Sequence, residues 1–192
     1  MIKLRELSNP VDDLSGDFQI VLVPGIGNSP EEHWQSYWHE QFPSWLRINQ
    51  KHWKDPDLYA WTSAIQRTLR TLPAAESAIL IGHSFGALSS VALSLSEPES
   101  VAALVLVAPA DPVRFELSDD LKRQPKCPVL MFASHNDPVM AWDQANHWAD
   151  IWGAHLTDMG EAAHINAQAG FGKWPWGLSH INQFLVEHLN GK

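Results

Sequence analysis

Residues 78–93 read Ala78-Ile79-Leu80-Ile81-Gly82-His83-Ser84-Phe85-Gly86-Ala87-Leu88-Ser89-Ser90-Val91-Ala92-Leu93. The first four residues are aliphatic and suit a strand buried in a parallel sheet, and the residues after Gly86 are typical of a helix. The glycines at 82 and 86 leave space where side chains would crowd the strand and the helix. The stretch therefore predicts a tight, strained strand-to-helix turn with Ser84 at its centre.

A Gly-x-Ser-x-Gly turn between a strand and a helix is the nucleophile elbow of the α/β-hydrolases. It lifts the serine hydroxyl above the carboxyl end of the strand. The alternative is an ordinary strand-to-helix turn that carries a surface serine. The buried strand and the alanine-rich helix favour the elbow, so we expect Ser84 to be a nucleophile.

The rest of the chain alternates between strand and helix patterns. We expect strands at residues 18–23, 46–49, 77–81, 101–107, 129–133 and 154–159, and helices from about 30–42, 55–72, 141–152 and 177–189. Such alternation predicts an α/β fold, a three-layer α/β/α sandwich around a six-stranded, mainly parallel sheet. At 192 residues the chain fits a single domain, 1–192. The connection 109–126 either covers a site or is a plain surface excursion.

Composition excludes several function classes. A formal net charge of -9 disfavours nucleic acid as a partner, and the absence of a long apolar run disfavours a membrane span. The N-terminus mixes charges and lacks the pattern of a secretory signal, so we expect a cytoplasmic protein. The single cysteine, Cys127, suits a small buried residue better than a nucleophile.

A serine nucleophile needs a histidine to accept its proton and a carboxylate to orient the imidazole. In this fold they follow the serine in the order acid, then histidine. Asp137 lies on the loop after the strand 129–133, and His164 lies on the loop after the last strand. Asp111 is the main rival for the acid because some hydrolases place it on that earlier loop, and Asp143 falls inside a predicted helix.

The tetrahedral intermediate needs two main-chain donors, one after the serine and one from the loop after the first strand. The first would be the amide of Phe85. The second is most simply the amide of Ile26, with Gly27 or Asn28 as alternatives. No metal or other cofactor is expected, because His33 and His39 are six residues apart rather than at the i, i+4 spacing of zinc ligands.

Several further motifs resemble the small serine hydrolases grouped with YdeN and retinoblastoma-binding protein nine. They span most of the chain and read Val23-Pro24-Gly25-Ile26-Gly27-Asn28-Ser29 with His33-Trp34-Gln35, Asp55-Pro56-Asp57-Leu58 with Trp61, the elbow, Ser134-His135-Asn136-Asp137-Pro138, Gly160-Glu161-Ala162-Ala163-His164-Ile165-Asn166 and Gly170-Phe171-Gly172-Lys173-Trp174-Pro175-Trp176-Gly177. The resemblance implies a Ser84, Asp137 and His164 triad. It also implies a six-stranded sheet that lacks the extra N-terminal hairpin of larger hydrolases. We expect a minimal α/β-hydrolase fold without a large cap domain. The Leu-x-Cys-x-Glu string of retinoblastoma binding is absent around Cys127, so that interaction is not expected.

Most of the ten tryptophans are expected in the core. Trp174 is different because it follows His164 closely, and we expect it to wall an apolar or aromatic acyl group. Asn28 and His33 are further candidate substrate-binding residues.

The resulting hypothesis is a cofactor-independent serine hydrolase acting on a small carboxylic ester, a thioester or an amide. A binding or scaffold protein with little turnover and an acyltransferase with the same triad are the alternatives. The sequence leaves the oligomeric state open.

Overall fold

The sheet is parallel throughout. The structure, a computed structural model, describes residues 8–14, 16, 18–73 and 77–190. Six strands lie in the order β2-β1-β3-β4-β5-β6, and every neighbouring pair is parallel. Their bounds are β1 Phe18–Val23, β2 Leu46–Arg47, β3 Ser77–His83, β4 Val101–Val107, β5 Val129–Ala133 and β6 His155–Asp158. The predicted α/β fold with a six-stranded parallel sheet is confirmed.

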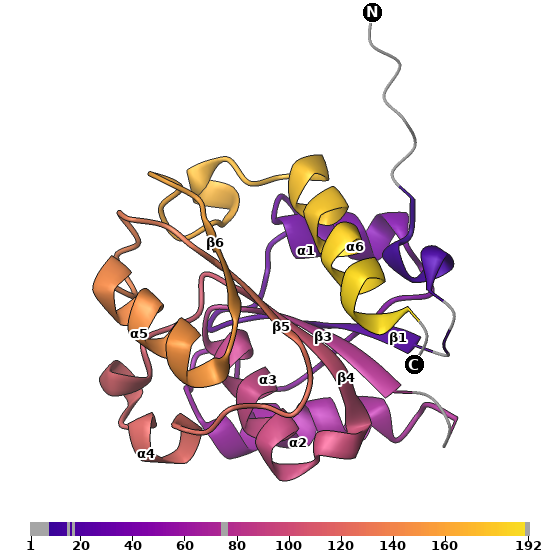
Figure 1. Cartoon of the computed structure of the whole chain (residues 1–192), viewed down its shortest axis with the longest axis horizontal. Coiled ribbons are helices and arrows are strands. Elements are labelled where there is room, and N and C mark those ends of the chain that lie inside the picture. The colour runs from indigo at the N-terminus through magenta and orange to yellow at the C-terminus, as the bar shows by residue number, and fades with distance from the viewer. Residues whose placement is uncertain (1–7, 15, 17, 74–76, 191–192) are drawn as a thin grey trace, which may run out of the picture.

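Helices cover both faces of this sheet, which gives the expected three layers (Figure 1). One face carries α1 (Trp34–Gln41) and α6 (Pro175–Leu189), and the other carries α2 (Leu58–Leu69), α3 (Phe85–Ser96) and α5 (Trp142–Trp152). Successive side chains of a strand point to opposite faces of the sheet, so Ile20 packs with α1 and α6 while Val21 packs with α2 and α3. No described helix is long and apolar enough to cross a membrane.

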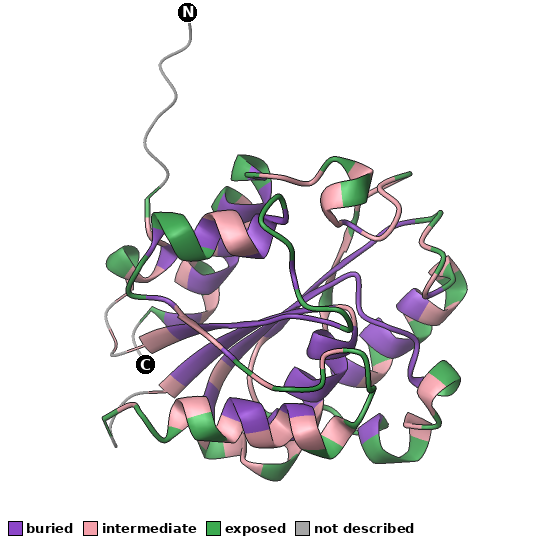
Figure 2. Cartoon of the chain, turned by 180° about the vertical axis from the view of Figure 1, so that it is seen from behind, coloured by how far each residue is buried: buried purple, intermediate pink, exposed green. Residues whose placement is uncertain are grey.

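The strand order reverses direction between β1 and β3. β1 lies between β2 and β3, so the chain leaves β1 in one direction and continues from β3 in the other. In open α/β sheets ligands bind beyond the carboxyl ends of the strands at such a point. Here those ends are Val23, which leads into the loop with Ile26, and His83, which precedes Ser84. Burial follows the layers, with the central strands β1, β3, β4 and β5 largely buried and the outer helix faces exposed (Figure 2).

Several element boundaries differ from the predicted ones, and capping side chains determine two of the helix starts. Helix α1 begins at Trp34 rather than near Pro30, since His33 is its N-cap and the ring accepts a bond from the amide of Gln35. Helix α2 begins at Leu58, where the carboxylate of Asp57 caps two amides. Strand β2 has two residues instead of four, and β3 runs to His83, two residues further than predicted.

The connection 109–126 is more ordered than its sequence suggests. It holds a 3₁₀ turn, Pro112–Phe115, and a short helix α4, Ser118–Leu121. Leu121 is fully buried, and its carbonyl accepts a bond from the indole of Trp152. Arg114 Nη1 donates to the carbonyls of Pro138 and Val139 at 2.9 and 3.0 Å. The segment therefore packs against the loop that follows β5.

Candidate active site

The turn at Ser84 has the geometry that its glycines predict. Ser84 has φ 56° and ψ −123°, a strained conformation for a residue with a side chain. A Cβ atom on Gly82 would lie 2.6 Å from the Cα of Ala87, and one on Gly86 would lie 2.5 Å from the carbonyl oxygen of Pro24. Glycine at both positions lets β3, α3 and the end of β1 approach each other, which raises Ser84 above the sheet edge.

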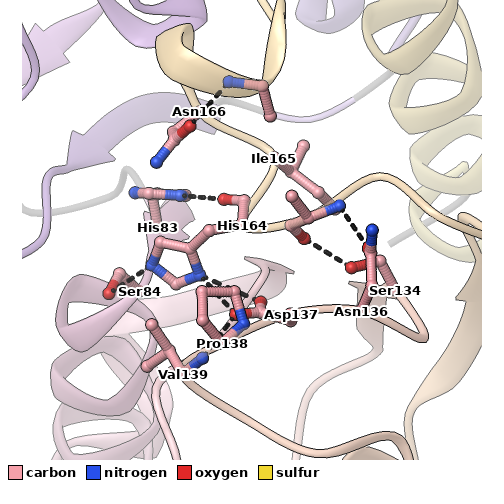
Figure 3. A network of polar contacts seen from close by, with 12 residues as sticks. His83, Ser84, Ser134, Asn136, Asp137, Pro138, Val139, His164, Ile165 and Asn166 are labelled. Carbon is pink, nitrogen blue, oxygen red and sulfur yellow. Dashed lines mark hydrogen bonds and ion pairs between the residues drawn. The ribbon is translucent and has the colours of Figure 1, made fainter.

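Ser84, His164 and Asp137 form one continuous set of hydrogen bonds (Figure 3). His164 Nε2 lies 3.0 Å from Ser84 Oγ. His164 Nδ1 lies 2.9 and 3.0 Å from the two carboxylate oxygens of Asp137. With Nδ1 donating to the carboxylate, Nε2 is the nitrogen left to accept a proton from the serine.

Asp137 is the candidate acid that contacts His164, and its two rivals lie elsewhere. Its side chain is only 4% exposed, and Oδ1 also accepts the amide of Val139 at 2.8 Å. Asp111 uses its carboxylate to cap the amide of Val113 at 2.9 Å. Asp143 lies in the first turn of α5. The structure thus brings Asp137, rather than Asp111 or Asp143, against His164.

The loop that carries His164 is held by side chains from other elements. Ala163 and Ile165, on either side of His164, have φ 47° and 46°. Three successive carbonyls of this loop accept side-chain hydrogen bonds: Ala163 from Ser134, His164 from His83, and Ile165 from Trp34. The amide of Ala163 also donates to Asn136 Oδ1 at 2.6 Å. A structural hydrogen bond of His83 is expected from its place beside Ser84, but the partners of Ser134, His83, Trp34 and Asn136 could not be read from the sequence.

Some main-chain amides near Ser84 already donate a hydrogen bond within the protein, and others do not. The amide of Gly27 donates to the carbonyl of Trp53 at 2.7 Å, and that of Asn28 donates to Gly25 at 3.1 Å. The amides of Ile26 and Phe85 donate to no acceptor among the described residues. Of the three candidates on the loop after β1, Ile26 is therefore the one with a free donor.

A pocket of about 220 Å³ lies beside Ser84 and His164. Its polar wall consists of two further histidines and three side-chain amides, namely His33, His83, Asn28, Asn166 and Gln168. The apolar side chains of the lining are Ile26, Pro30 and Ala167. Asn28 and His33 thus line the pocket, and their role in substrate binding stays a prediction. The contribution of residues 166–168 was not predicted.

The expectation that Trp174 walls this pocket is wrong. Trp174 is 8% exposed, and its ring stacks on Trp38 with a centroid distance of 5.8 Å. It also meets Trp34 and Phe132 edge to face. The ring of Trp174 belongs to the apolar core between the sheet and helices α1 and α6. Trp174 is therefore not part of the pocket lining.

Burial keeps the two extra histidines uncharged. His33 is 3% exposed, and burial, with smaller contributions from Arg47 and His164, lowers its pKa to about 3. Burial also lowers the pKa of His83 well below 6.5, assisted by His33 and His164. Both rings are therefore neutral near pH 7. The described residues contain no group of three or more histidine, cysteine or acidic side chains that could hold a metal ion.

Comparison with known proteins adds a family and a set of similar structures. A protein-family model described as serine hydrolase matches residues 20–183. No curated protein matches the chain. A structure described as a YdeN-like hydrolase from Pectobacterium atrosepticum is 44% identical, with a TM-score of 0.88 over 95% of this chain and 98% of that chain.

Two more distant structures share the fold. The ydeN gene product of B. subtilis is 16% identical, with a TM-score of 0.70 over 87% of this chain and 98% of that one. Est1E from Butyrivibrio proteoclasticus with bound ferulic acid is 13% identical, with a TM-score of 0.71 over 94% and 93% of the two chains. At these identities the likeness concerns the fold alone.

Proposed function

The chain belongs to the serine hydrolase family, and from this premise we propose that it hydrolyses a small carboxylic ester through an acyl-enzyme. Ser84 attacks the ester carbonyl while His164 Nε2 accepts the hydroxyl proton. His164 then gives this proton to the departing alkoxide, and the alcohol leaves. Water, deprotonated by the same nitrogen, attacks the acyl-enzyme and releases the acid and free Ser84.

The negative charge of each tetrahedral intermediate needs donors that are already in place. We propose the amides of Ile26 and Phe85 for this role, because neither has an acceptor among the described residues. Such preorganised donors stabilise the oxyanion more than they stabilise the planar ester carbonyl. Asp137 keeps the proton of His164 on Nδ1 and stabilises the imidazolium that forms transiently.

One observation carries the proposal: the unbroken path from Ser84 Oγ through the ring of His164 to the buried carboxylate of Asp137. The pocket supports a small substrate, because about 220 Å³ is less than the roughly 300–1,000 Å³ typical of drug-sized ligands. A pocket of this size suits a short acyl group better than a long acyl chain. The same groups could attack a thioester or an amide, so the rates of hydrolysis of these substrates should be compared with that of the ester.

The test combines a fluorophosphonate probe with 4-nitrophenyl esters of increasing acyl length. We expect the wild-type protein to be labelled and to hydrolyse the acetate with a kcat/KM at least about 10-fold above that of the decanoate. Ser84→Ala should abolish labelling and lower kcat by about 10³-fold or more. Ser63→Ala, a serine substitution in α2, is the matched control and should behave as the wild type.

Each alternative predicts a different result in the same experiment. A folded wild-type protein that is neither labelled nor active would contradict the hydrolase mechanism and favour a binding protein. Labelling without release of the free acid, when an alcohol or amine acceptor is present, would identify an acyltransferase. A preference for the decanoate would contradict the small-substrate part of the proposal alone.

A further inference from the structure

The residue before the nucleophile, His83, contacts the catalytic loop rather than the reacting atoms. Its Nε2 lies 2.9 Å from the main-chain carbonyl oxygen of His164, as Figure 3 shows. A carbonyl oxygen can only accept, so the proton of the neutral ring must be on Nε2. His83 is the last residue of β3 and is 6% exposed. The central strand β3 thus places the Nε2–H of His83 in a fixed position, from which it donates to the carbonyl of His164.

That peptide lies in a loop which needs external support. The positive φ angles of Ala163 and Ile165 are unfavourable for residues with a side chain. Such conformations persist only where the surroundings impose them. Here the bonds from Ser134, His83 and Trp34 occupy the three successive carbonyls of the loop. The bond from His83 is the middle one, on the residue whose ring does the chemistry.

We propose that His83 is a positioning residue, whose Nε2–H holds the main chain of His164 where its ring meets both Ser84 and Asp137. This inference rests on the proposed function, because it assigns His83 a role through His164. A displacement of about 1 Å in a catalytic group can lower the rate about 100-fold. His83 and His164 therefore cooperate, although only His164 exchanges protons with Ser84.

The surroundings of His83 favour a donor whose protonation does not change during turnover. Its ring lies between those of His33 and His164, with centroid distances of 4.8 and 4.9 Å. His33 and His164 both lower the pKa of His83 electrostatically, and Arg47 and His164 lower that of His33 in the same way. A second positive charge beside His164 would oppose formation of the imidazolium. Burial, which lowers the pKa of His83, prevents that charge from forming.

Substitutions at His83 separate the hydrogen bond from the volume of the side chain. His83→Gln can place an amide N–H close to the position of Nε2, whereas His83→Leu fills the space without a donor. We expect His83→Leu to lower kcat for 4-nitrophenyl acetate by about 10- to 100-fold, with a smaller change in KM. His83→Gln should recover kcat to within about fivefold of the wild type. A folded Leu variant with wild-type kcat, or a folded Gln variant as slow as Leu, would overturn the proposal.

A measurement on the unsubstituted protein keeps the inference testable if a variant does not fold. In the wild-type protein labelled with ¹⁵N-histidine, the ring of His83 should remain the neutral tautomer with the proton on Nε2 between about pH 6 and pH 8. A proton on Nδ1, or a charged ring in this range, would overturn the proposal. An inactive, unlabelled wild type would instead contradict the proposed hydrolase function, and the tautomer of His83 would still decide whether the bond exists.

Discussion

Ser84 is held in its strained conformation by the main chain around it. Its amide donates to the carbonyl of Val107 at 3.1 Å, and its carbonyl accepts the amides of Ala87 and Ala110 at 3.0 and 3.1 Å. The main chain of Ser84, with its positive φ, cannot relax to an ordinary conformation without breaking its hydrogen bonds to β4 and α3. The position of Oγ is thereby determined before any substrate binds.

At the same scale, Asp137 and His164 could be predicted because each follows a strand at the carboxyl edge of a parallel sheet. That rule places a residue at the site without knowledge of side-chain packing. Trp174 could not be placed in this way. Its ring direction depends on Trp34 and Trp38, which are more than a hundred residues earlier in the chain and whose packing no local pattern specifies.

The choice between the two candidate acids leads to a prediction with a matched pair of variants. Asp137→Asn keeps the shape of the side chain but removes the charge that selects the tautomer of His164. We expect kcat to fall by about 10²- to 10⁴-fold. Asp111→Asn makes the same chemical change at a residue that only caps a turn, and asparagine also caps, so its kcat should stay within about threefold of wild type. Steady-state kinetics with 4-nitrophenyl acetate measures both, and a larger loss in Asp111→Asn would reassign the acid.

Among the elements, the strands were easier to predict than the points where helices begin. Aliphatic runs identify the buried strands β1, β3, β4 and β5 directly. The starts of α1 and α2 depend instead on which polar side chain caps them, and several residues before each helix could do so. The segment 109–126 lacked a pattern because its order comes from long-range contacts such as that of Arg114 with the loop after β5.

The close approach of β1, β3 and α3 depends on glycine, which has no side chain, at residue 86. In Gly86→Ala the new methyl group would overlap the main-chain carbonyls of Val23 and Pro24. We expect the free energy of unfolding to fall by about 2 kcal/mol or more, because backbone atoms cannot rotate away as a side chain can. Gly172→Ala is the control, since its Cβ would lie 3.5 Å from the ring of Tyr37, an ordinary contact, and should change stability by less than about 1 kcal/mol. Urea denaturation compares the two, and equal stabilities would refute the steric account.

For the whole molecule, the two apolar clusters lie on opposite faces of one sheet. Alternate residues of β1, β3, β4 and β5 contribute to both, so neither cluster can be lost without disturbing the strands of the other. We propose on this basis that the chain is a single domain. Thermal unfolding followed by tryptophan fluorescence and by far-UV circular dichroism should then give one coincident transition.

The buried histidines should make this stability depend on pH. The pKa of His33 is about 3 in the folded protein, compared with 6.5 for an unperturbed histidine. Between these values the unfolded state binds more protons, so the free energy of unfolding falls as the pH falls below about 6.5. His33→Asn, which can still cap α1, should reduce this decline between about pH 6 and pH 5 by about 1 kcal/mol. Urea titrations at each pH test this prediction.

The control for this titration is His52→Asn, the same substitution at an exposed histidine. It should leave the decline with pH as in the wild type. A His33→Asn variant whose stability falls as steeply as that of the His52 variant would show that His33 does not contribute.

The anchors of the catalytic loop also affect when the site forms during folding. Ile165 is held by Trp34 from 131 positions earlier in the sequence, and His164 is held by His83 from 81 positions earlier. Contacts between residues so far apart form only after long loops have closed, which makes them late and slow events. A chain that has collapsed and has formed its helices, but has not yet brought β1, β3 and the C-terminal segment together, lacks a positioned base. Recovery of esterase activity after dilution from denaturant would therefore report completion of the last tertiary contacts, rather than the first appearance of secondary structure.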